Sequence, residues 1–110
     1  IRDSISTGGL TVLPGPVESA LSTHPAVAEC AVFGIDDARL GQRVVAAVVT
    51  APGAPPPTLE ELRAHVAASL DSTAAPRELH LVASLPRRGI GKLDRKALVL
   101  RFSAVRKASD

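Results

Sequence analysis

Apolar residues recur along the chain with two different periods, and the changes of period mark the predicted secondary-structure elements. β-Branched and apolar residues fill 27–35 and 44–50, which predicts two strands, and the polar stretch 36–43 between them has the length of a hairpin connection. Partial alternation over 78–85 predicts a third strand. A Ser-Thr-Gly-Gly turn followed by a short β-prone run predicts an N-terminal hairpin within residues 1–13.

Helical spacing of apolar residues predicts three helices. The first covers residues 17–23 and is stopped by Pro25. The second begins at Thr58, where Glu61 three residues later completes a capping box, and the third covers residues 93–102. The order hairpin, helix, two strands, helix, strand, helix predicts an α+β fold, with a small three-stranded sheet, helices packed on it and an N-terminal β-hairpin.

Composition limits the chain to one domain with a core of aliphatic residues. Its 110 residues are 45% hydrophobic, but two Phe are the only aromatic residues, so the stacking of bases or sugars on aromatic side chains is nearly excluded. The apolar runs are too short for a membrane span or a hydrophobic signal segment, which predicts a cytoplasmic protein. Because the chain begins at Ile1 rather than Met, we expect it to be a piece of a longer protein.

The single cysteine and the histidines offer little chemistry. Cys30 lies in an apolar run, which favours a packed thiol over a nucleophile, because buried thiols without a cationic neighbour are inert. The histidines His24, His65 and His80 fall in three different segments without metal-ligand spacing, so we expect no metal site.

Positive charge gathers near the C-terminus. The net charge is only +2, but residues 87–107 carry eight Arg and Lys against one acidic residue, Asp94. This part of the chain should attract anions. Within it, Gly89 and Gly91 free the backbone for a tight loop, and Lys92 follows at the predicted start of the last helix, where a phosphate or carboxylate could bind. A solvated surface lysine is the alternative.

Four blocks of the chain resemble a known family, in the family's order. They are residues 5–21, 24–49, 58–70 and 75–95. Together they are similar to the C-terminal domain of the adenylate-forming enzymes, which include acyl- and aryl-CoA synthetases, adenylation domains and luciferases. Within that superfamily, the sequences GGLTVLP and PRRGIGKLDR most resemble the o-succinylbenzoate–CoA ligases of menaquinone synthesis.

The resemblance implies a two-step reaction. Such enzymes join a carboxylic acid to ATP as an acyl-adenylate, release pyrophosphate, and then pass the acyl group to the thiol of coenzyme A. Lys92 would bridge carboxylate and phosphate oxygens, and Gly89 and Gly91 would let its loop close over the nucleotide. We expect ATP and Mg²⁺ to be bound mainly by a separate N-terminal domain, the partner of this chain, and we expect the isolated chain to be inactive.

The resemblance also implies domain boundaries. Residues 1–4 correspond to the end of the interdomain hinge, and residues 5–110 to the mobile C-terminal domain. Arg2 stands at the hinge position, which is usually acidic or Lys, and Asp3 follows it.

A second surface is implied for the thiol-transfer step. The loop that would line the pantetheine tunnel consists of Ser6, Thr7, Gly8 and Gly9. Arg77 corresponds to a basic position near the phosphates of coenzyme A, although a solvated arginine is an open alternative. Leu40 stands where some relatives carry an aromatic residue that packs on the adenine of coenzyme A.

Other functions remain open from the sequence. The acid could differ, as in another acyl- or aryl-CoA synthetase, and the acceptor could be a carrier-protein thiol, as in an adenylation domain. From a different class, the basic tail fits a nucleic-acid- or protein-binding module, although no stacking aromatics or nucleic-acid motif accompany it. We therefore expect no nucleic-acid or membrane partner.

Overall fold

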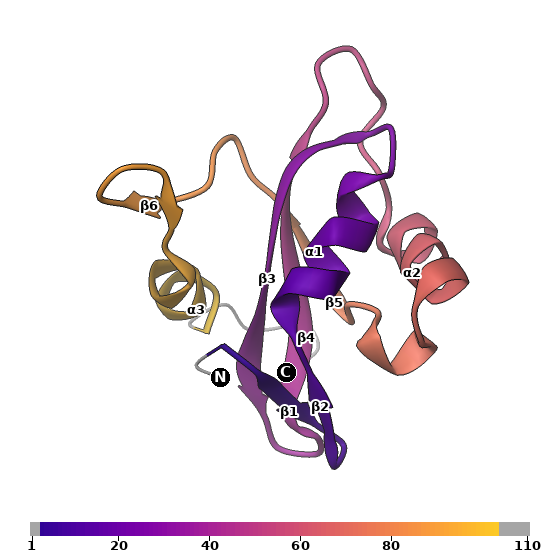
Figure 1. Cartoon of the computed structure of the whole chain (residues 1–110), viewed down its shortest axis with the longest axis vertical. Helices are drawn as coiled ribbons and strands as arrows, with labels where there is room; N and C mark the ends of the chain where they lie inside the picture. The colour runs from indigo at the N-terminus through magenta and orange to yellow at the C-terminus, as the bar shows by residue number, and fades with distance from the viewer. Residues whose placement is uncertain (1–2, 104–110) are drawn as a thin grey trace.

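Two long antiparallel strands form the centre of the fold (Figure 1). β3 (Val27–Asp37) and β4 (Gly41–Thr50) pair from end to end in the computed structural model, which describes residues 3–103. The predicted hinge residue Arg2 lies outside the described residues. The β-branched side chains that predicted these strands point alternately to the two faces of the sheet, so each strand contributes to two cores.

Short strands extend the sheet on one side only. β1 (Ile5–Thr7) and β2 (Leu10–Val12) form a hairpin that joins β4 through the pair Thr7 and Gly41. Further along the same edge, β5 (Glu78–Leu81) pairs with β4 in parallel. The strand order is β2-β1-β4-β3 with β5 also on β4, so β3 is an outer strand of the sheet.

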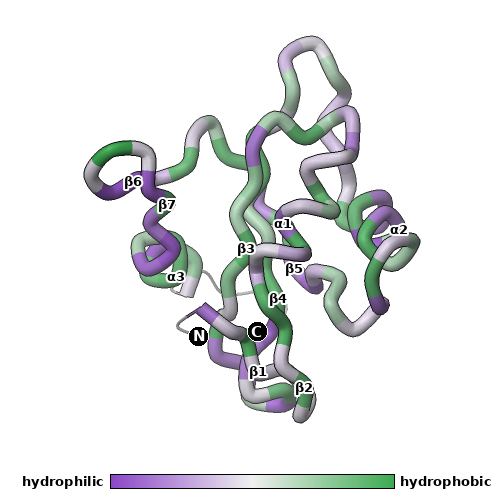
Figure 2. The backbone as a smooth tube through the Cα atoms, in the orientation of Figure 1, coloured by the Kyte–Doolittle hydropathy of each residue, from purple (hydrophilic) through white to green (hydrophobic). Residues whose placement is uncertain are grey.

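Helices cover both faces of the sheet. α1 (Pro14–Ser22) and α2 (Leu59–Ser69) pack on one face, and the short helix η1 (Ser72–Ala74) follows α2. α3 (Arg95–Ser103) covers the other face. Figure 2 shows the hydrophobic positions running along β3 and β4 between these layers. No helix within residues 3–103 has the length and apolar character needed to cross a bilayer.

The predicted α+β class, three helices, three strands and hairpin are confirmed, with corrections to their bounds and pairing. The hairpin is part of the main sheet, which therefore has five strands instead of three. The connection between β3 and β4 shrinks to residues 38–40, because the Asp37 carboxylate accepts hydrogen bonds from the backbone of Arg39 and Leu40, both at 2.9 Å. β5 ends at Leu81, four residues early.

The helix starts also differ from the prediction. α1 begins at Pro14, because proline is tolerated in the first turn, where its missing N–H has no partner to lose. α3 begins at Arg95, two residues late, because residues 92–93 form a strand, β7 (Lys92–Leu93), that pairs with β6 (Arg87–Arg88). This two-stranded element was not predicted.

The capping box of α2 gives a first testable prediction. The Thr58 hydroxyl accepts from the Glu61 N–H at 3.1 Å, and the Glu61 carboxylate accepts from the Thr58 N–H at 3.2 Å. Thr58→Ala should therefore lower the free energy of unfolding by about 1 kcal/mol. Urea denaturation measures this. Thr58→Ser, which keeps the hydroxyl, should stay close to the wild type, and equal stability of all three proteins would contradict the prediction.

Candidate functional site

The lysine loop, residues 85–95, projects from the molecule as a small hairpin. Its two strands pair through Arg88 and Lys92, and its turn is built on Gly89 and Gly91, whose φ angles are +56° and +75°. Both angles lie in the left-handed region, which glycine adopts without steric cost. Ile90 at the tip is fully exposed, with a relative accessibility of 102%. The loop therefore holds its tip clear of the domain.

Lys92 is exposed, and its ammonium makes no ion pair or hydrogen bond with another described residue. The expectation that it lies at a helix N-terminus is wrong. The α3 helix begins three residues later, and Asp94 caps it by accepting the Ala97 N–H at 3.0 Å. The Asp94 carboxylate therefore already occupies the positively polarised N-terminus of α3. An anion that binds at this loop would interact with the charge of Lys92 instead of with the helix N-terminus.

Arg95 fixes the base of the lysine loop to the sheet. Its guanidinium donates to both carboxylate oxygens of Glu18 on α1, with Nη2–oxygen distances of 2.7 and 2.8 Å. Its Nε also donates to the Val32 carbonyl at 3.2 Å, and its Nη1 lies 3.4 Å from the Asp3 carboxylate. A two-pronged Arg–carboxylate pair of this kind is directional as well as strong.

The Glu18–Arg95 pair also closes the outer edge of the sheet. On the side of β3 away from β4, the Val32 N–H donates to Glu18 at 2.7 Å, and the Val32 carbonyl accepts from Arg95. Glu18 comes from the helix layer on one face and Arg95 from the helix on the other. The pair therefore joins the two layers around the β3 edge and occupies the outward backbone groups of Val32, which another strand would otherwise need for pairing at that point.

The other end of the lysine loop has a weaker anchor. The guanidinium of Arg87 lies 2.7 Å from the Glu29 carboxylate and donates to the Gly91 carbonyl at 3.3 Å. Both side chains of this ion pair are close to half exposed, so water screens it. Between the anchors, the Asp94 N–H donates to the Pro86 carbonyl at 2.9 Å and closes the hairpin.

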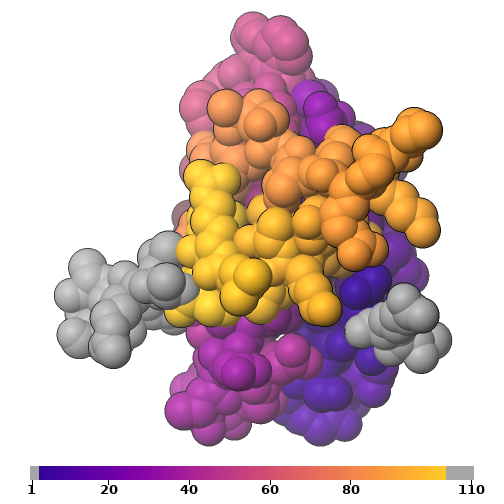
Figure 3. Space-filling view, turned by 90° about the vertical axis from the view of Figure 1, so that its left-hand side faces the viewer, coloured from indigo at the N-terminus to yellow at the C-terminus, as the bar shows by residue number. Residues whose placement is uncertain are grey.

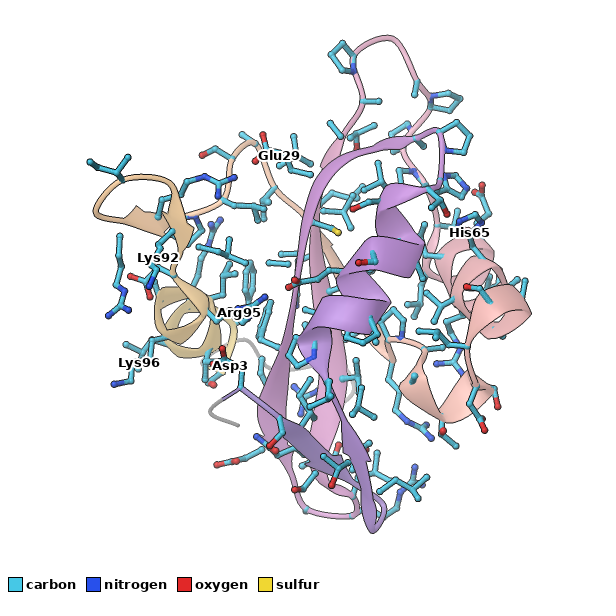
Figure 4. The ribbon with its side chains drawn as sticks, viewed as in Figure 1. Asp3, Glu29, His65, Lys92, Arg95 and Lys96 are labelled. Carbon is cyan, nitrogen blue, oxygen red and sulfur yellow. The ribbon has the colours of Figure 1, made fainter. Side chains whose placement is uncertain are left out.

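An open groove of about 390 Å³ runs beside the lysine loop. Figure 4 shows Asp3, Arg95, Lys96 and Lys92 on this side of the sheet and His65 on the opposite side. In Figure 3, the lysine loop, α3 and the start of the chain lie next to one another on this surface. The groove is lined by Asp3, Ser4, Phe33, Gly34, Gln42, Arg88, Leu93, Asp94, Arg95, Lys96 and Val99.

The residues expected at the pantetheine tunnel gather elsewhere, at the start of β4. The β1–β2 turn is held there by a hydrogen bond from the Gly8 N–H to the Leu40 carbonyl at 2.8 Å. Gly8 and Gly9 both have positive φ angles, +58° and +83°. The Arg77 N–H donates to the Val44 carbonyl at 2.8 Å, which places Arg77 on the same edge of the sheet. Lys92 is on the far side of β3, so the structure forms two separate surfaces.

Known proteins resemble this chain along most of its length. The family described as AMP-binding enzyme C-terminal domain matches residues 16–92, a range that ends at Lys92. The chain belongs to this family. It is 73% identical over 101 residues to a protein of Mycobacterium tuberculosis described as a probable 2-succinylbenzoate–CoA ligase, with 92% of this chain and 26% of that protein covered.

Solved structures in the AMP-binding enzyme family have the same fold. An acyl-CoA synthetase of Brucella canis matches with a TM-score of 0.86 and 40% identity over 91% of this chain and 19% of that one. The ATP-bound MatB of Rhodopseudomonas palustris matches with a TM-score of 0.88 and 29% identity over 96% of this chain and 21% of that one. The resemblance seen in the sequence is confirmed, and the chain spans about a quarter or less of these relatives' lengths.

Cys30 is half-buried and packed against α1. Its thiol lies 3.6 Å from the Ser22 hydroxyl and donates to the Glu18 carbonyl at 3.4 Å. Burial raises the pKa of the Cys30 thiol, and the nearby Glu18 charge adds to this, while the Ser22 hydroxyl opposes it. The raised pKa agrees with the packed, unreactive thiol that the sequence predicts.

The histidines take part in structural contacts in two places, one shared by His24 and His65 and one at His80. The His65 ring nitrogen lies 2.7 Å from the Thr23 hydroxyl, and the His24 ring packs edge-on against His65 at 5.0 Å. His80 stacks on Phe102 at 3.9 Å and hydrogen-bonds Glu78 at 2.6 Å. Among residues 3–103, no three His, Cys, Asp or Glu side chains come together as a metal site.

The Glu18–Arg95 pair leads to a second prediction. Glu18→Ala leaves the Val32 N–H and the Arg95 guanidinium without their charged partner, so it should lower the free energy of unfolding by about 2 kcal/mol. Glu29→Ala removes the exposed partner of Arg87 and should cost less than about 1 kcal/mol. Urea denaturation of the two variants side by side provides the comparison. Equal losses of unfolding free energy in the two variants would contradict the prediction, because they would show that the contacts of Glu18 at the β3 edge add no stability beyond that of an exposed ion pair.

The raised pKa of Cys30 leads to a third prediction. At pH 8, iodoacetamide should alkylate Cys30 in the folded protein several times more slowly than it alkylates a cysteine in a short peptide, because only the thiolate reacts and burial disfavours it. Mass spectrometry follows the adduct. In urea, the reaction should reach the rate of the peptide. Fast alkylation of the folded protein would mean that Cys30 is an activated thiol.

Proposed function

We propose that this chain is the C-terminal domain of an ATP-dependent carboxylate–CoA ligase, with residues 1–4 as the end of the hinge and residues 5–110 as the mobile domain. The observation that carries the proposal is Lys92, an unpaired ammonium on a glycine hairpin whose base is fixed to the sheet by Arg95. Membership of the AMP-binding enzyme family supports it and favours a ligase over a nucleic-acid- or protein-binding module.

Lys92 would act in the first half-reaction. There, a carboxylate oxygen attacks the α-phosphorus of ATP, a new P–O bond forms, and the bond to pyrophosphate breaks. Two anions meet in this step, so a cation placed between them stabilises the transition state more than the separated reactants. The long, flexible side chain would let the ammonium extend to the reacting oxygens, while the anchored hairpin would restrict the positions that the ammonium can adopt.

Gly89 and Gly91 would serve the approach of the loop to the nucleotide. At either position there is nothing within 4 Å of where a Cβ atom would lie, so the glycines are not required by packing inside this domain. Their positive φ angles form the turn, and because they have no side chains, the backbone of the loop could approach another molecule closely. Ile90 between them is the part of the loop that would meet the N-terminal domain first.

The start of β4 would serve the second half-reaction, in which the thiol of coenzyme A displaces AMP from the acyl-adenylate. The residues proposed to line the pantetheine path are Ser6, Thr7, Gly8 and Gly9. Gly9 has open space around its α-carbon, which suits a narrow thiol arm. Arg77 is exposed on the same sheet edge and could meet the coenzyme A phosphates.

ATP and Mg²⁺ would be held mainly by the N-terminal domain. Mg²⁺ prefers carboxylate, phosphate and water oxygens, and residues 3–103 bring together no group of three acidic or histidine side chains to hold it. Lys92 would add its charge to that of the metal when the two domains meet. The Asp3 and Arg2 positions would form the end of the connection between the domains.

For the acid, we propose 2-succinylbenzoate. The support is the 73% identity to a protein described as a probable 2-succinylbenzoate–CoA ligase. The groups that would contact the acid belong to the N-terminal domain, so another acyl or aryl acid, or a carrier-protein acceptor, is the alternative.

Separate measurement of the two half-reactions tests the role of Lys92. In the full-length protein, Lys92→Ala should slow pyrophosphate release with 2-succinylbenzoate and ATP by about 10²- to 10³-fold, the loss seen when one transition-state donor is removed. Thioester formation from supplied acyl-adenylate and coenzyme A should stay within about twofold, because Lys92 acts at the phosphate. Rapid-quench assays follow both steps.

Lys96→Ala is the matched control. Lys96 is an exposed lysine four residues away on α3, so its removal makes the same charge change and should leave both half-reactions near the wild-type rates. An equal loss in both half-reactions for Lys92→Ala, or no loss, would overturn the proposed role. Pyrophosphate release with other acids but not with 2-succinylbenzoate would overturn only the choice of acid.

A further inference from the structure

Two cations stand opposite each other on the lysine loop. Arg88 and Lys92 are direct partners in the antiparallel pairing of β6 and β7. Residues directly opposite in an antiparallel ladder project from the same face, with their Cβ atoms about 4.5–5.5 Å apart. Arg88 is therefore the neighbour of Lys92 on one face of the hairpin, although Gly89, Ile90 and Gly91 lie between them in sequence.

Within the part of the chain that the structure describes, no acidic side chain pairs with either of these cations. Residues 87–93 contain three basic residues and no Asp or Glu. Of the three, Arg87 has a partner, the carboxylate of Glu29. Arg88 is exposed, and its guanidinium, like the ammonium of Lys92, makes no ion pair or hydrogen bond with another described residue. The hairpin therefore presents two free positive charges side by side.

This arrangement has a cost that a bound anion would remove. Like charges directly opposite each other destabilise a ladder. Here the turn glycines and the backbone bond from Asp94 to Pro86 hold the two strands together, so the charges cannot separate by opening the hairpin freely. An anion that contacts both side chains would cancel the repulsion and accept charge-assisted hydrogen bonds from each. The pair therefore suits a ligand that carries negative charge on more than one group.

We propose that Arg88 is a second catalytic cation of the lysine loop and that it binds the phosphate chain of ATP beside Lys92 during acyl-adenylate formation. This inference rests on the proposed function, in which Lys92 bridges the attacking carboxylate and the α-phosphate. The β-phosphate is one oxygen link further along the chain, so a side chain beside Lys92 can contact it. The planar guanidinium of Arg88 presents paired N–H donors, which match the oxygens of a phosphate group.

At this position Arg88 acts on the leaving group. As the carboxylate oxygen bonds to the α-phosphorus, the bond from that phosphorus to the bridging oxygen breaks, and its electron pair leaves with pyrophosphate. No proton has to move in this step. Negative charge grows on the bridging oxygen, so the contact with Arg88 is stronger in the transition state than in bound ATP. Lys92 and Arg88 then stabilise charge on the two sides of the reacting phosphorus.

The two half-reactions of Arg88 variants in the full-length protein test this role. Arg88→Gln removes the charge, so pyrophosphate release should slow about 10- to 100-fold, the loss expected when a hydrogen bond to a charged group is removed. Arg88→Lys keeps the charge without the planar fork and should lose less than about tenfold. Thioester formation from supplied acyl-adenylate should stay within about twofold in both variants, because pyrophosphate has already left. Normal pyrophosphate release in Arg88→Gln, or an equal loss in both half-reactions, would overturn the role.

The substrate dependence of the first half-reaction identifies the ligand. Because Arg88 already contacts the phosphates in bound ATP, Arg88→Gln should raise the KM for ATP as well as lower the maximal rate. The KM for the carboxylic acid should stay within about twofold. A raised KM for the acid with an unchanged KM for ATP would overturn the assignment of Arg88 to the phosphate chain.

Urea denaturation separates this role from a structural one. Because Arg88 faces a like charge, Arg88→Gln should leave the unfolding midpoint unchanged or raise it. A lower midpoint would show that the arginine holds the hairpin together, and it would overturn the proposal. Arg39→Gln is the matched control, because Arg39 is an exposed arginine in the turn between β3 and β4, outside the lysine loop. Its pyrophosphate release should stay near the wild-type rate, and a loss equal to that of Arg88→Gln would also overturn the proposal.

Lys92→Ala in the same assay separates this inference from the proposed function. A large loss of pyrophosphate release in Lys92→Ala together with a normal rate in Arg88→Gln would overturn the role of Arg88 alone. No loss in Lys92→Ala would overturn the proposed function and the role of Arg88 with it.

Discussion

The Glu18–Arg95 ion pair is the interaction on which the site depends. It joins α1 on one face to α3 on the other around the outer edge of β3. It also hydrogen-bonds the N–H and the carbonyl of Val32, which point away from β4. Because Arg95 is the first residue of α3, the same pair fixes where the lysine loop leaves the domain. Without it, the loop would be tied to the sheet by α3 packing and by the screened Arg87–Glu29 pair. The edge of the sheet and the placement of Lys92 thus have one physical cause.

Much of the fold could be predicted from the sequence because its elements follow from local patterns. The β-branched runs of β3 and β4, the Thr58–Glu61 box of α2 and the stop at Pro25 are each contained in a few neighbouring residues. The parallel pairing of β5 with β4 could not be predicted, since it depends on which sheet edge is free after β1 has joined. The two-residue strands β6 and β7 are too short to have a period.

The site could be predicted only in part, for a similar reason. Glycines around a lysine are visible in the sequence, and so a tight loop with Lys92 was predicted. The strand at Lys92–Leu93, which separates this lysine from the start of α3, was not predicted. The groups that hold the loop could not be found this way. Glu18 and Arg95 are 77 residues apart, and each alone is an ordinary charged residue on an amphipathic helix. Only the fold shows that β3 is an outer strand whose backbone needs both of them.

The distribution of strong and weak contacts fits a domain that moves as a rigid body. The Glu18–Arg95 pair is mostly shielded from water and joins α1 to α3, whereas the Arg95–Asp3 contact has a half-exposed carboxylate and lies at the N-terminal end of the described residues. The start of β4 and the lysine loop lie on opposite sides of β3. Under the proposed function, a rotation of the whole domain would therefore exchange the two surfaces without any rearrangement inside it.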